Sequence, residues 1–237
     1  DGLEAALMRT VDQGESWEFV SELPFQGPVI PSLVRAGSAT LYVTTYINTN
    51  NAAIVANNLG VTLEPGVHMF RSEDAGLSWS YAAGWDAGSS SHAICAQHGG
   101  DPTSVLALDS TGAIHLSYGA AEMGFQLQGS WGNKGSMLSC AWSPTGAVLL
   151  ADTAYCIEPA VDGCAAVWSS TDMGATTAMV GNYTAAGSGN RSVIAASPDG
   201  SFMAMGDDTQ LFRSVDDGVT WSFVTDIPAN KAVGDIT

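Results

Sequence analysis

Acidic side chains carry most of the reactive chemistry in this sequence, which has 24 Asp and Glu residues, seven Lys and Arg residues and a formal net charge of −17. Five of the acids are each followed by a glycine two positions later. Carboxylates that converge on one pocket can transfer protons or hold a cation, whereas carboxylates that lie apart can each close a turn by accepting backbone hydrogen bonds. The five acid–glycine pairs are Asp12–Gly14, Asp74–Gly76, Glu122–Gly124, Asp172–Gly174 and Asp216–Gly218.

The residues around each pair favour turn closure. In four of the copies a Ser or Thr precedes the acid by two positions and another follows it by four, as Ser214 and Thr220 do around Asp216. These hydroxyls can bond across the turn, and the glycine supplies the positive φ that other residues resist. We call this unit the acid–glycine turn. A Trp that can bury a large ring on the next strand follows three of the turns, at Trp17, Trp79 and Trp221.

The spacing of the five acids makes the turn a repeat. Successive acids are 62, 48, 50 and 44 residues apart, and a period of roughly 40–50 residues is typical of a propeller or a solenoid. The 27 glycines and the hydrophobic content of 46% suit many short strands joined by tight turns. The sequence therefore predicts an all-β fold built from small antiparallel sheets.

The pattern Ser-x-Asp-x-Gly-x-Thr-Trp at 214–221, closely matched at 72–79 and 10–17, resembles the Asp-box, or bacterial neuraminidase repeat, of the sialidase-like and sortilin-like superfamily. The copy at Asp172 lacks the Trp, and the copy at Glu122 is degenerate. The resemblance implies a β-propeller of four-stranded antiparallel blades, in which the box is structural, joins the third and fourth strands and lies away from the active face. We expect one domain, 1–237, with about five blades, or six or seven if the sequence is part of a longer chain. The expected blades are 1–23 together with 231–237, 28–84, 92–130, 136–183 and 192–226.

The face opposite the acid–glycine turns is the expected binding face, because it carries the turns between second and third strands and the links between blades. Two insertions, 46–66 and 152–165, fall on it, and loops presented by a rigid scaffold commonly carry function. Aromatic residues recur after the fourth strand at Trp85, Trp131 and Tyr183, and Arg191 shares a link with Tyr183. These four residues are candidates for binding a sugar or a peptide. In the alternative interpretation, the aromatic rings pack between blades.

Catalysis is the main alternative to binding. A sialidase gathers three arginines, but Arg9, Arg71 and Arg213 each precede an acid–glycine turn on the wrong face, and the Phe-Arg-Ile-Pro motif of that family is absent. A glycoside hydrolase of the Asp-box propeller type would need a carboxylate pair about 5–10 Å apart, and no motif selects one. An assembly factor of the photosystem kind uses an arginine-rich face, which this acidic chain lacks. The acids that could reach the binding face are Asp86, Asp152, Asp162 and Asp207.

Cysteines and glycosylation motifs favour a secreted or cell-surface location. Cys156 and Cys164 bracket a short loop that a disulfide can close. Cys95 and Cys140 occupy equivalent points of successive repeats, where they form either a disulfide between blades or two buried thiols. Two N-glycosylation motifs begin at Asn182 and Asn190.

Composition disfavours several classes of partner. The negative charge does not suit nucleic acid or an anionic membrane surface, and no run of 18 apolar residues is present to span a bilayer. The four histidines lack metal-ligand spacing, so no metal and no cofactor are expected. The sequence thus predicts a non-catalytic module that binds protein or glycan and belongs to a larger assembly.

Overall fold

The structure is a computed structural model. Its described residues form 18 strands in five antiparallel sheets, and within each sheet the strands are neighbours in chain order. We number the sheets as blades 1 to 5. The residues that the structure describes are 4–12, 14–26, 32–36, 39–47, 62–85, 92–96, 104–109, 112–118, 124–130, 137–152, 164–184, 192–197, 201–206 and 210–226.

The blades have the following strands. Blade 1 has β1 (Glu4–Arg9) and β2 (Glu18–Gln26). Blade 2 has β3 (Ser32–Arg35), β4 (Leu41–Ile47), β5 (Gly66–Ser72) and β6 (Ser80–Trp85). Blade 3 has β7 (His92–Ala96), β8 (Val105–Asp109), β9 (Ala113–Tyr118) and β10 (Gly124–Ser130). Blade 4 has β11 (Met137–Trp142), β12 (Val148–Asp152), β13 (Cys164–Ser170) and β14 (Ala178–Thr184), and blade 5 has β15 (Ser192–Ala196), β16 (Phe202–Gly206), β17 (Gln210–Ser214) and β18 (Ser222–Asp226).

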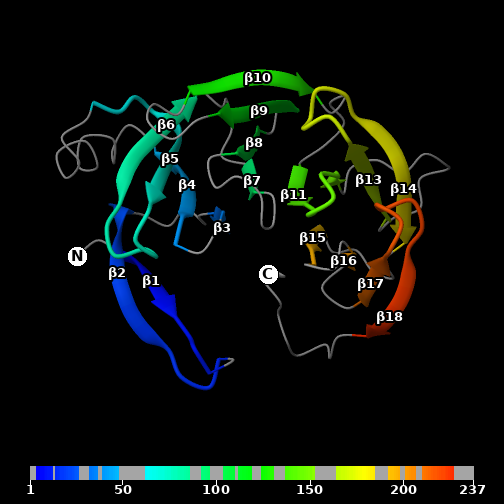
Figure 1. The fold of residues 1–237 in the computed structure, drawn as a ribbon, viewed down its shortest axis with the longest axis horizontal. Coiled ribbons are helices and arrows are strands. Elements are labelled where there is room, and N and C mark those ends of the chain that lie inside the picture. The colour runs from blue at the N-terminus through cyan, green and yellow to red at the C-terminus, as the bar shows by residue number, and fades with distance from the viewer. Residues whose placement is uncertain are drawn as a thin grey trace.

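The five sheets follow one another around an arc with their first strands innermost, so the chain folds as the predicted β-propeller (Figure 1). The inner strands of neighbouring blades contact one another, β3 with β7, β7 with β11 and β11 with β15. Blades 1 and 5 lie at the two ends of the arc. The tail 231–237, predicted to complete blade 1, lies outside the described residues. Among those residues, no helix is long and apolar enough to cross a membrane.

Every blade has a β-bulge at the same place in its outer pair of strands. In blade 1, Leu7 pairs with Ser21 but Met8 pairs with Phe19, so Val20 is the extra residue on β2. A bulge changes which way the following side chains point, and its shared position lets residues of different blades be aligned. The residues equivalent to Leu7 are Met69, Ile114, Val167 and Leu211, and those equivalent to Ser21 are Ala83, Gly129, Gly181 and Thr225.

The hydrophobic core lies between successive sheets. Leu23 of blade 1 packs with Val43 and Phe70 of blade 2. Further along the arc, the same face-to-face packing joins blades 2 and 3, blades 3 and 4, and blades 4 and 5. Each four-stranded sheet is therefore held by apolar contacts with its neighbours, and such burial is the main stabilising contribution in this fold.

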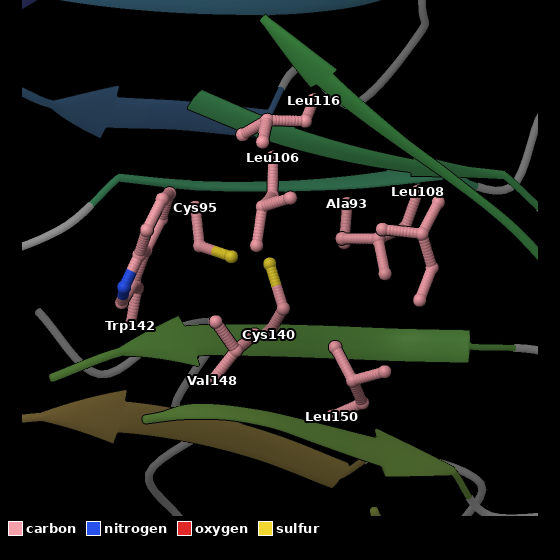
Figure 2. Packing of buried hydrophobic residues seen from close by; sticks show 10 residues of the cluster. Ala93, Cys95, Leu106, Leu108, Leu116, Cys140, Trp142, Val148 and Leu150 are labelled. Carbon is pink, nitrogen blue, oxygen red and sulfur yellow. The ribbon is translucent and has the colours of Figure 1, made fainter. Parts of the chain in front are cut away.

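The core between blades 3 and 4 contains Cys95 and Cys140, whose sulfur atoms face each other across the gap between β7 and β11 (Figure 2). Both are buried thiols in the structure, so the predicted Cys95–Cys140 disulfide is not formed and the alternative of two buried thiols is the one observed. The reason is their setting: Leu106 and Val148 pack around the two side chains from the two sheets, and the thiols fill that apolar space as small hydrophobic groups. Cys156 lies outside the described residues, and the side chain of Cys164 is not described.

Candidate functional site

The acid–glycine turns have the same hydrogen-bond geometry in blades 1, 2, 4 and 5, each between the third and fourth strand positions. In blade 2 the Ser72 hydroxyl donates to Asp74 Oδ1 at 2.8 Å and accepts from the Gly76 N–H at 2.8 Å. Asp74 also accepts the Ser78 N–H on Oδ1 at 2.9 Å and the Ser78 hydroxyl on Oδ2 at 2.6 Å. The same bonds recur around Asp12, Asp172 and Asp216, with donor–acceptor distances of 2.5–2.9 Å.

These bonds stabilise the charged form of each carboxylate. The hydroxyl and N–H of Ser16 and the hydroxyl of Thr10 lower the pKa of Asp12 to about 2, and the corresponding bonds lower the pKa of Asp74 to about 2. The pKa values of Asp172 and Asp216 are also lowered, chiefly by Thr176 and Thr220. A carboxylate whose oxygens already accept three donors, and whose pKa is this low, is poorly suited to proton transfer near neutral pH. Each of these four acids therefore bonds within its own turn.

The backbone of each turn enters the left-handed region. Gly14, Gly76, Gly174 and Gly218 have φ values between +83° and +92°, which confirms the predicted role of the glycine. The preceding residue is left-handed as well, at Ala75, Met173 and Asp217 with φ of 55–58°. The sequence gives no signal for this second left-handed position, because alanine, methionine and aspartate share no side-chain property that would mark it.

The glycine has a second role that sequence analysis missed, which is to admit a side chain of the preceding blade. A Cβ placed on Gly76 would overlap the Leu7 side chain of blade 1. A Cβ on Gly174 would lie 2.6 Å from Ile114 Cγ2 of blade 3, and one on Gly218 would lie 2.7 Å from Leu149 Cδ1 of blade 4. Each of these turns is therefore a contact between blades as well as a hairpin corner.

Polar bonds accompany this apolar contact. Ser21 on β2 donates its hydroxyl to the Gly76 carbonyl and accepts the Trp79 indole N–H at 3.2 Å. On the opposite side of the arc, the Thr177 hydroxyl of blade 4 donates to the Ser130 carbonyl of blade 3 at 3.1 Å. The outer strand of one blade thus bonds to the turn region of the next.

Blade 1 differs because no blade precedes it in the described structure. Nothing lies within 4 Å of a Cβ placed on Gly14. The Trp17 side chain is 60% exposed, whereas Trp79 and Trp221 pack against the clusters that join their blades to the preceding ones. Among the described residues, Trp17 therefore does not bury its ring as Trp79 and Trp221 do.

The arginines beside the turns remain within their own blades. Arg9 pairs with Glu18 at 2.5 Å. Arg71 pairs with Glu73 at 2.7 Å and lies 5.9 Å from the centre of the Tyr42 ring. Arg213 donates to the Ser201 hydroxyl at 3.4 Å. The three guanidinium groups thus belong to three blades and form no common anion site.

His68 is a buried residue of blade 2. Its Nε2 lies 2.7 Å from the Glu64 carbonyl and its Nδ1 lies 3.4 Å from the Tyr81 hydroxyl. Burial lowers the pKa of His68, opposed by the bond to Glu64, which keeps the ring neutral near pH 7. Within the described ranges, no group of three or more His, Cys, Asp and Glu residues could hold a metal ion.

Two of the four predicted ligand residues, Trp85 and Tyr183, lie at or near the ends of described strands. Trp85 is the last residue of β6, and Tyr183 is the second-to-last residue of β14. The side chains of these two residues are not described. Trp131 and Arg191 lie outside the described residues, as do Glu122, Asn190 and the insertions between 48 and 61 and between 153 and 163. Asn182 and Asp152 are strand residues whose side chains are not described. The binding face therefore remains a prediction.

Comparison with known proteins supports the fold. No family model matches the chain, and no curated protein matches it. Among solved structures, YCF48 bound to D1 peptide is 17% identical with a TM-score of 0.51, and the match covers 94% of this chain and 62% of that one. The α-L-arabinofuranosidase Arb93A of Fusarium graminearum is 12% identical with a TM-score of 0.58, and the match covers 92% of this chain and 72% of that enzyme. The α-L-arabinanase of Penicillium chrysogenum, complexed with arabinobiose, is 11% identical with a TM-score of 0.53, covering 93% and 72%.

These similarities, together with the sheet order, define the class of protein as a β-propeller. The chain spans less than two thirds of the YCF48 structure that it matches. At such low identity the shared architecture says nothing of ligand or reaction, because one fold hosts many functions.

Proposed function

We propose that this chain is a non-catalytic, single-domain binding module of the Asp-box propeller family, secreted or at the cell surface. It binds protein or glycan through the loop face opposite the acid–glycine turns. The observation that carries this proposal is the use of the turn carboxylates. In four blades the acid that recurs in the sequence is fully engaged in closing its own turn, so the most regular feature of the chain serves the scaffold.

Two further facts support a binding role over catalysis. Arg9, Arg71 and Arg213 lie in three different blades, so these three do not gather into a cationic site of the kind that a sialidase needs. In addition, the fold is similar to that of YCF48, which was solved bound to D1 peptide. A propeller of this fold can therefore bind a peptide, and we infer a peptide or glycan ligand for this chain.

The proposal is tested by screening the protein against a glycan array and an immobilised peptide library. For a ligand that binds, changing the candidate residues by Trp85→Ala, Trp131→Ala, Tyr183→Ala and Arg191→Ala should weaken binding by about tenfold or more for at least two of the four, which corresponds to about 1.4 kcal/mol. Leu77→Ala and Val215→Ala are matched controls, because both residues are exposed in acid–glycine turns on the opposite face. Equal losses in the candidate and control variants would contradict the proposed face.

A glycoside hydrolase is the second candidate, favoured by the fold that the chain shares with the two arabinan-active enzymes. Incubation with arabinan and arabinobiose, followed by analysis of released sugars, separates the two functions. The binding proposal predicts no release above the buffer blank. Hydrolysis by the wild-type chain would contradict the binding proposal. Its loss in Asp86→Asn, Asp152→Asn, Asp162→Asn or Asp207→Asn would show that the protein is a glycoside hydrolase.

A further inference from the structure

His68 on β5 ties a short stretch of chain back onto blade 2. Its side chain is 5% exposed, and its Nε2 lies 2.7 Å from the carbonyl oxygen of Glu64, four residues earlier. A carbonyl oxygen can only accept a hydrogen bond, so Nε2 carries the ring proton and donates it to Glu64. We call residues 62–65, which lead directly into β5, the arm.

The other ring nitrogen of His68 is engaged from a different strand. In a neutral imidazole with its proton on Nε2, Nδ1 is an acceptor. The Tyr81 hydroxyl of β6 lies 3.4 Å from Nδ1 and donates to it, and the centres of the two rings are 5.9 Å apart. The arm and β6 thus satisfy both nitrogens of His68 in its neutral form.

Apolar packing holds the arm at the same place. Leu63, next to Glu64, is 6% exposed and belongs to the cluster between blades 1 and 2. The residues on either side of it, Thr62 and Glu64, are exposed. The burial of Leu63 and the hydrogen bond from His68 therefore attach an otherwise exposed segment to the blade.

A glycine on β6 leaves room for the His68–Tyr81 pair. A Cβ placed on Gly84 would lie 2.6 Å from His68 Nδ1 and 2.7 Å from the Tyr81 hydroxyl oxygen, which is closer than real Cβ atoms come. Gly84 does not have the positive φ of the turn glycines, so an alanine would suit the backbone at this position. What the glycine preserves is the space for the two side chains.

The surroundings of His68 disfavour its charged form. Burial lowers the pKa of His68, and the bond to the Glu64 carbonyl opposes this shift only in part. Among the described residues packed around the ring, the titratable groups are Tyr81, whose pKa is raised by burial, and Glu64, whose side chain is exposed. Glu22 of blade 1 lies on the other face of β2 from Leu23, which packs against blade 2.

We propose that His68 is an acid-sensitive latch, which holds the arm on blade 2 at neutral pH and releases it in mild acid. On release, Nδ1 takes up a proton from water and the resulting cation is hydrated, while the Glu64 carbonyl loses its donor. An exposed histidine has a pKa of about 6.5, and buried His68 has a lower one, so the open form binds the proton more readily. The stability of the closed form is therefore fully present above about pH 6.5 and is lost as the pH falls below it.

Release of the arm would also affect the proposed binding face, because the arm is the described end of the insertion predicted at 46–66. This consequence rests on the proposed function, whereas the latch can be measured in the absence of any ligand. Release in acid by a chain that binds no peptide or glycan would support the latch and contradict the proposed function. Ligand binding by a chain whose arm stays closed in acid would do the reverse.

An NMR titration of the 237-residue chain from pH 7.5 to pH 4.5 tests the latch. The His68 ring should titrate below the ordinary value of about 6.5. The Leu63 methyl signals and the backbone signals of residues 62–65 should move toward random-coil values with the same midpoint, because Leu63 leaves its cluster when the arm opens. Signals of β12 and β13 should not move with them. Leu63 signals that stay at their neutral-pH positions while His68 becomes protonated would overturn the proposal.

Two histidine variants separate His68 from the rest of the chain. The side-chain amide of His68→Gln can still donate to the Glu64 carbonyl but does not titrate, so its arm should stay closed down to pH 4.5. His115→Gln is the matched control, because it removes a half-buried histidine of blade 3, and its arm should open as in the wild-type chain. Release of the arm in His68→Gln at the wild-type midpoint would show that another group is responsible.

The variant Gly84→Ala tests the position of the ring without removing the histidine. Its Cβ would displace His68 and Tyr81 from each other, so the Leu63 signals should already be shifted toward random-coil values at pH 7.5. Wild-type positions of these signals in the folded Gly84→Ala variant would contradict a latch that depends on this pair.

Discussion

Leu7 on β1 lies over Gly76 so closely that the glycine has no room for a side chain. This contact joins two blades at a point where the chain also needs a positive φ, so one glycine meets two requirements at once. Ile114 over Gly174 and Leu149 over Gly218 repeat the arrangement. The acid–glycine turn is therefore best understood as a rigid corner that seats each blade on the one before it.

Replacing Gly76 should cost more stability than replacing Gly14. Both glycines have φ of +92°, so an alanine at either position suffers a left-handed strain of about 1–2 kcal/mol. Gly76→Ala also collides with Leu7, which adds about 1–3 kcal/mol of overpacking, whereas Gly14→Ala meets open space. Urea unfolding of dilute protein measures the free energy of unfolding of both variants. Equal losses of stability would show that the contact between Leu7 and position 76 adds nothing to the cost of the substitution.

Acid should destabilise the protein through the turn carboxylates. The pKa values of Asp12 and Asp74 are about 2 in the folded chain against an ordinary value of 3.8. Since the folded pKa is lower, these groups contribute stability that is fully present above about pH 4 and is lost as the pH falls toward 2. The free energy of unfolding from urea titrations at several pH values should fall over this window.

The variant Asp74→Asn provides the control for that pH dependence. Asparagine cannot titrate, so the fall in stability between pH 4 and pH 2 should be shallower in Asp74→Asn than in the wild-type chain. An identical slope would mean that other acids cause the acid sensitivity. A wild-type chain whose stability is constant down to pH 2 would contradict the low pKa values themselves.

The fold could be predicted from sequence because the features that define it are local. The hydroxyls of Ser72 and Ser78 and the carboxylate of Asp74 lie within seven residues of one another, and they bond as their spacing suggests. The repeat period then indicates how often this corner returns. The local hydrogen-bond chemistry of the turn and the repeat period are together sufficient to predict the order of strands in the sheets.

Features that depend on distant residues could not be read in the same way. Ser21 bonds to Gly76, 55 positions away, and no local pattern identifies that pair. The exposure of Trp17 is a similar case, because the sequence around Trp17 closely matches that around Trp79, yet among the described residues only Trp79 packs against a neighbouring sheet. The candidate ligand residues Trp131 and Arg191 lie outside the described residues, so the binding face rests on the alternation of strand direction.

The four cysteines should fall into two classes in their reaction with a thiol reagent. Cys95 and Cys140 are buried thiols, and Cys156 and Cys164 are predicted to form a disulfide. A thiol reagent without reductant should therefore label the native protein very slowly and should label two of the four cysteines after unfolding. Labelling of all four would contradict the Cys156–Cys164 disulfide, and labelling of none would show that Cys95 and Cys140 have become oxidised.

The packing of the core between blades predicts that two leucines of blade 3 contribute very differently to the free energy of unfolding. Leu106 is fully buried in the cluster between blades 3 and 4, whereas Leu127 on the outer strand is largely exposed. Leu106→Ala should lower the free energy of unfolding by about 2–5 kcal/mol, and Leu127→Ala should change it by less than about 0.5 kcal/mol. Chemical denaturation compares the two, and a small effect of Leu106→Ala would argue against a core between the sheets.

The central claim, that the recurring acids hold turns and do no chemistry, is tested most directly by comparing two adjacent acids of one turn. Asp216 accepts bonds from Ser214 and Thr220, whereas its neighbour Asp217 occupies a left-handed position that asparagine tolerates. Asp216→Asn and Asp217→Asn change the net charge equally. Thermal unfolding at pH 7 should show a clearly lower midpoint for Asp216→Asn and a nearly unchanged midpoint for Asp217→Asn, while ligand binding by both folded variants stays at the wild-type level. Unchanged stability of Asp216→Asn combined with lost binding or activity would contradict the claim.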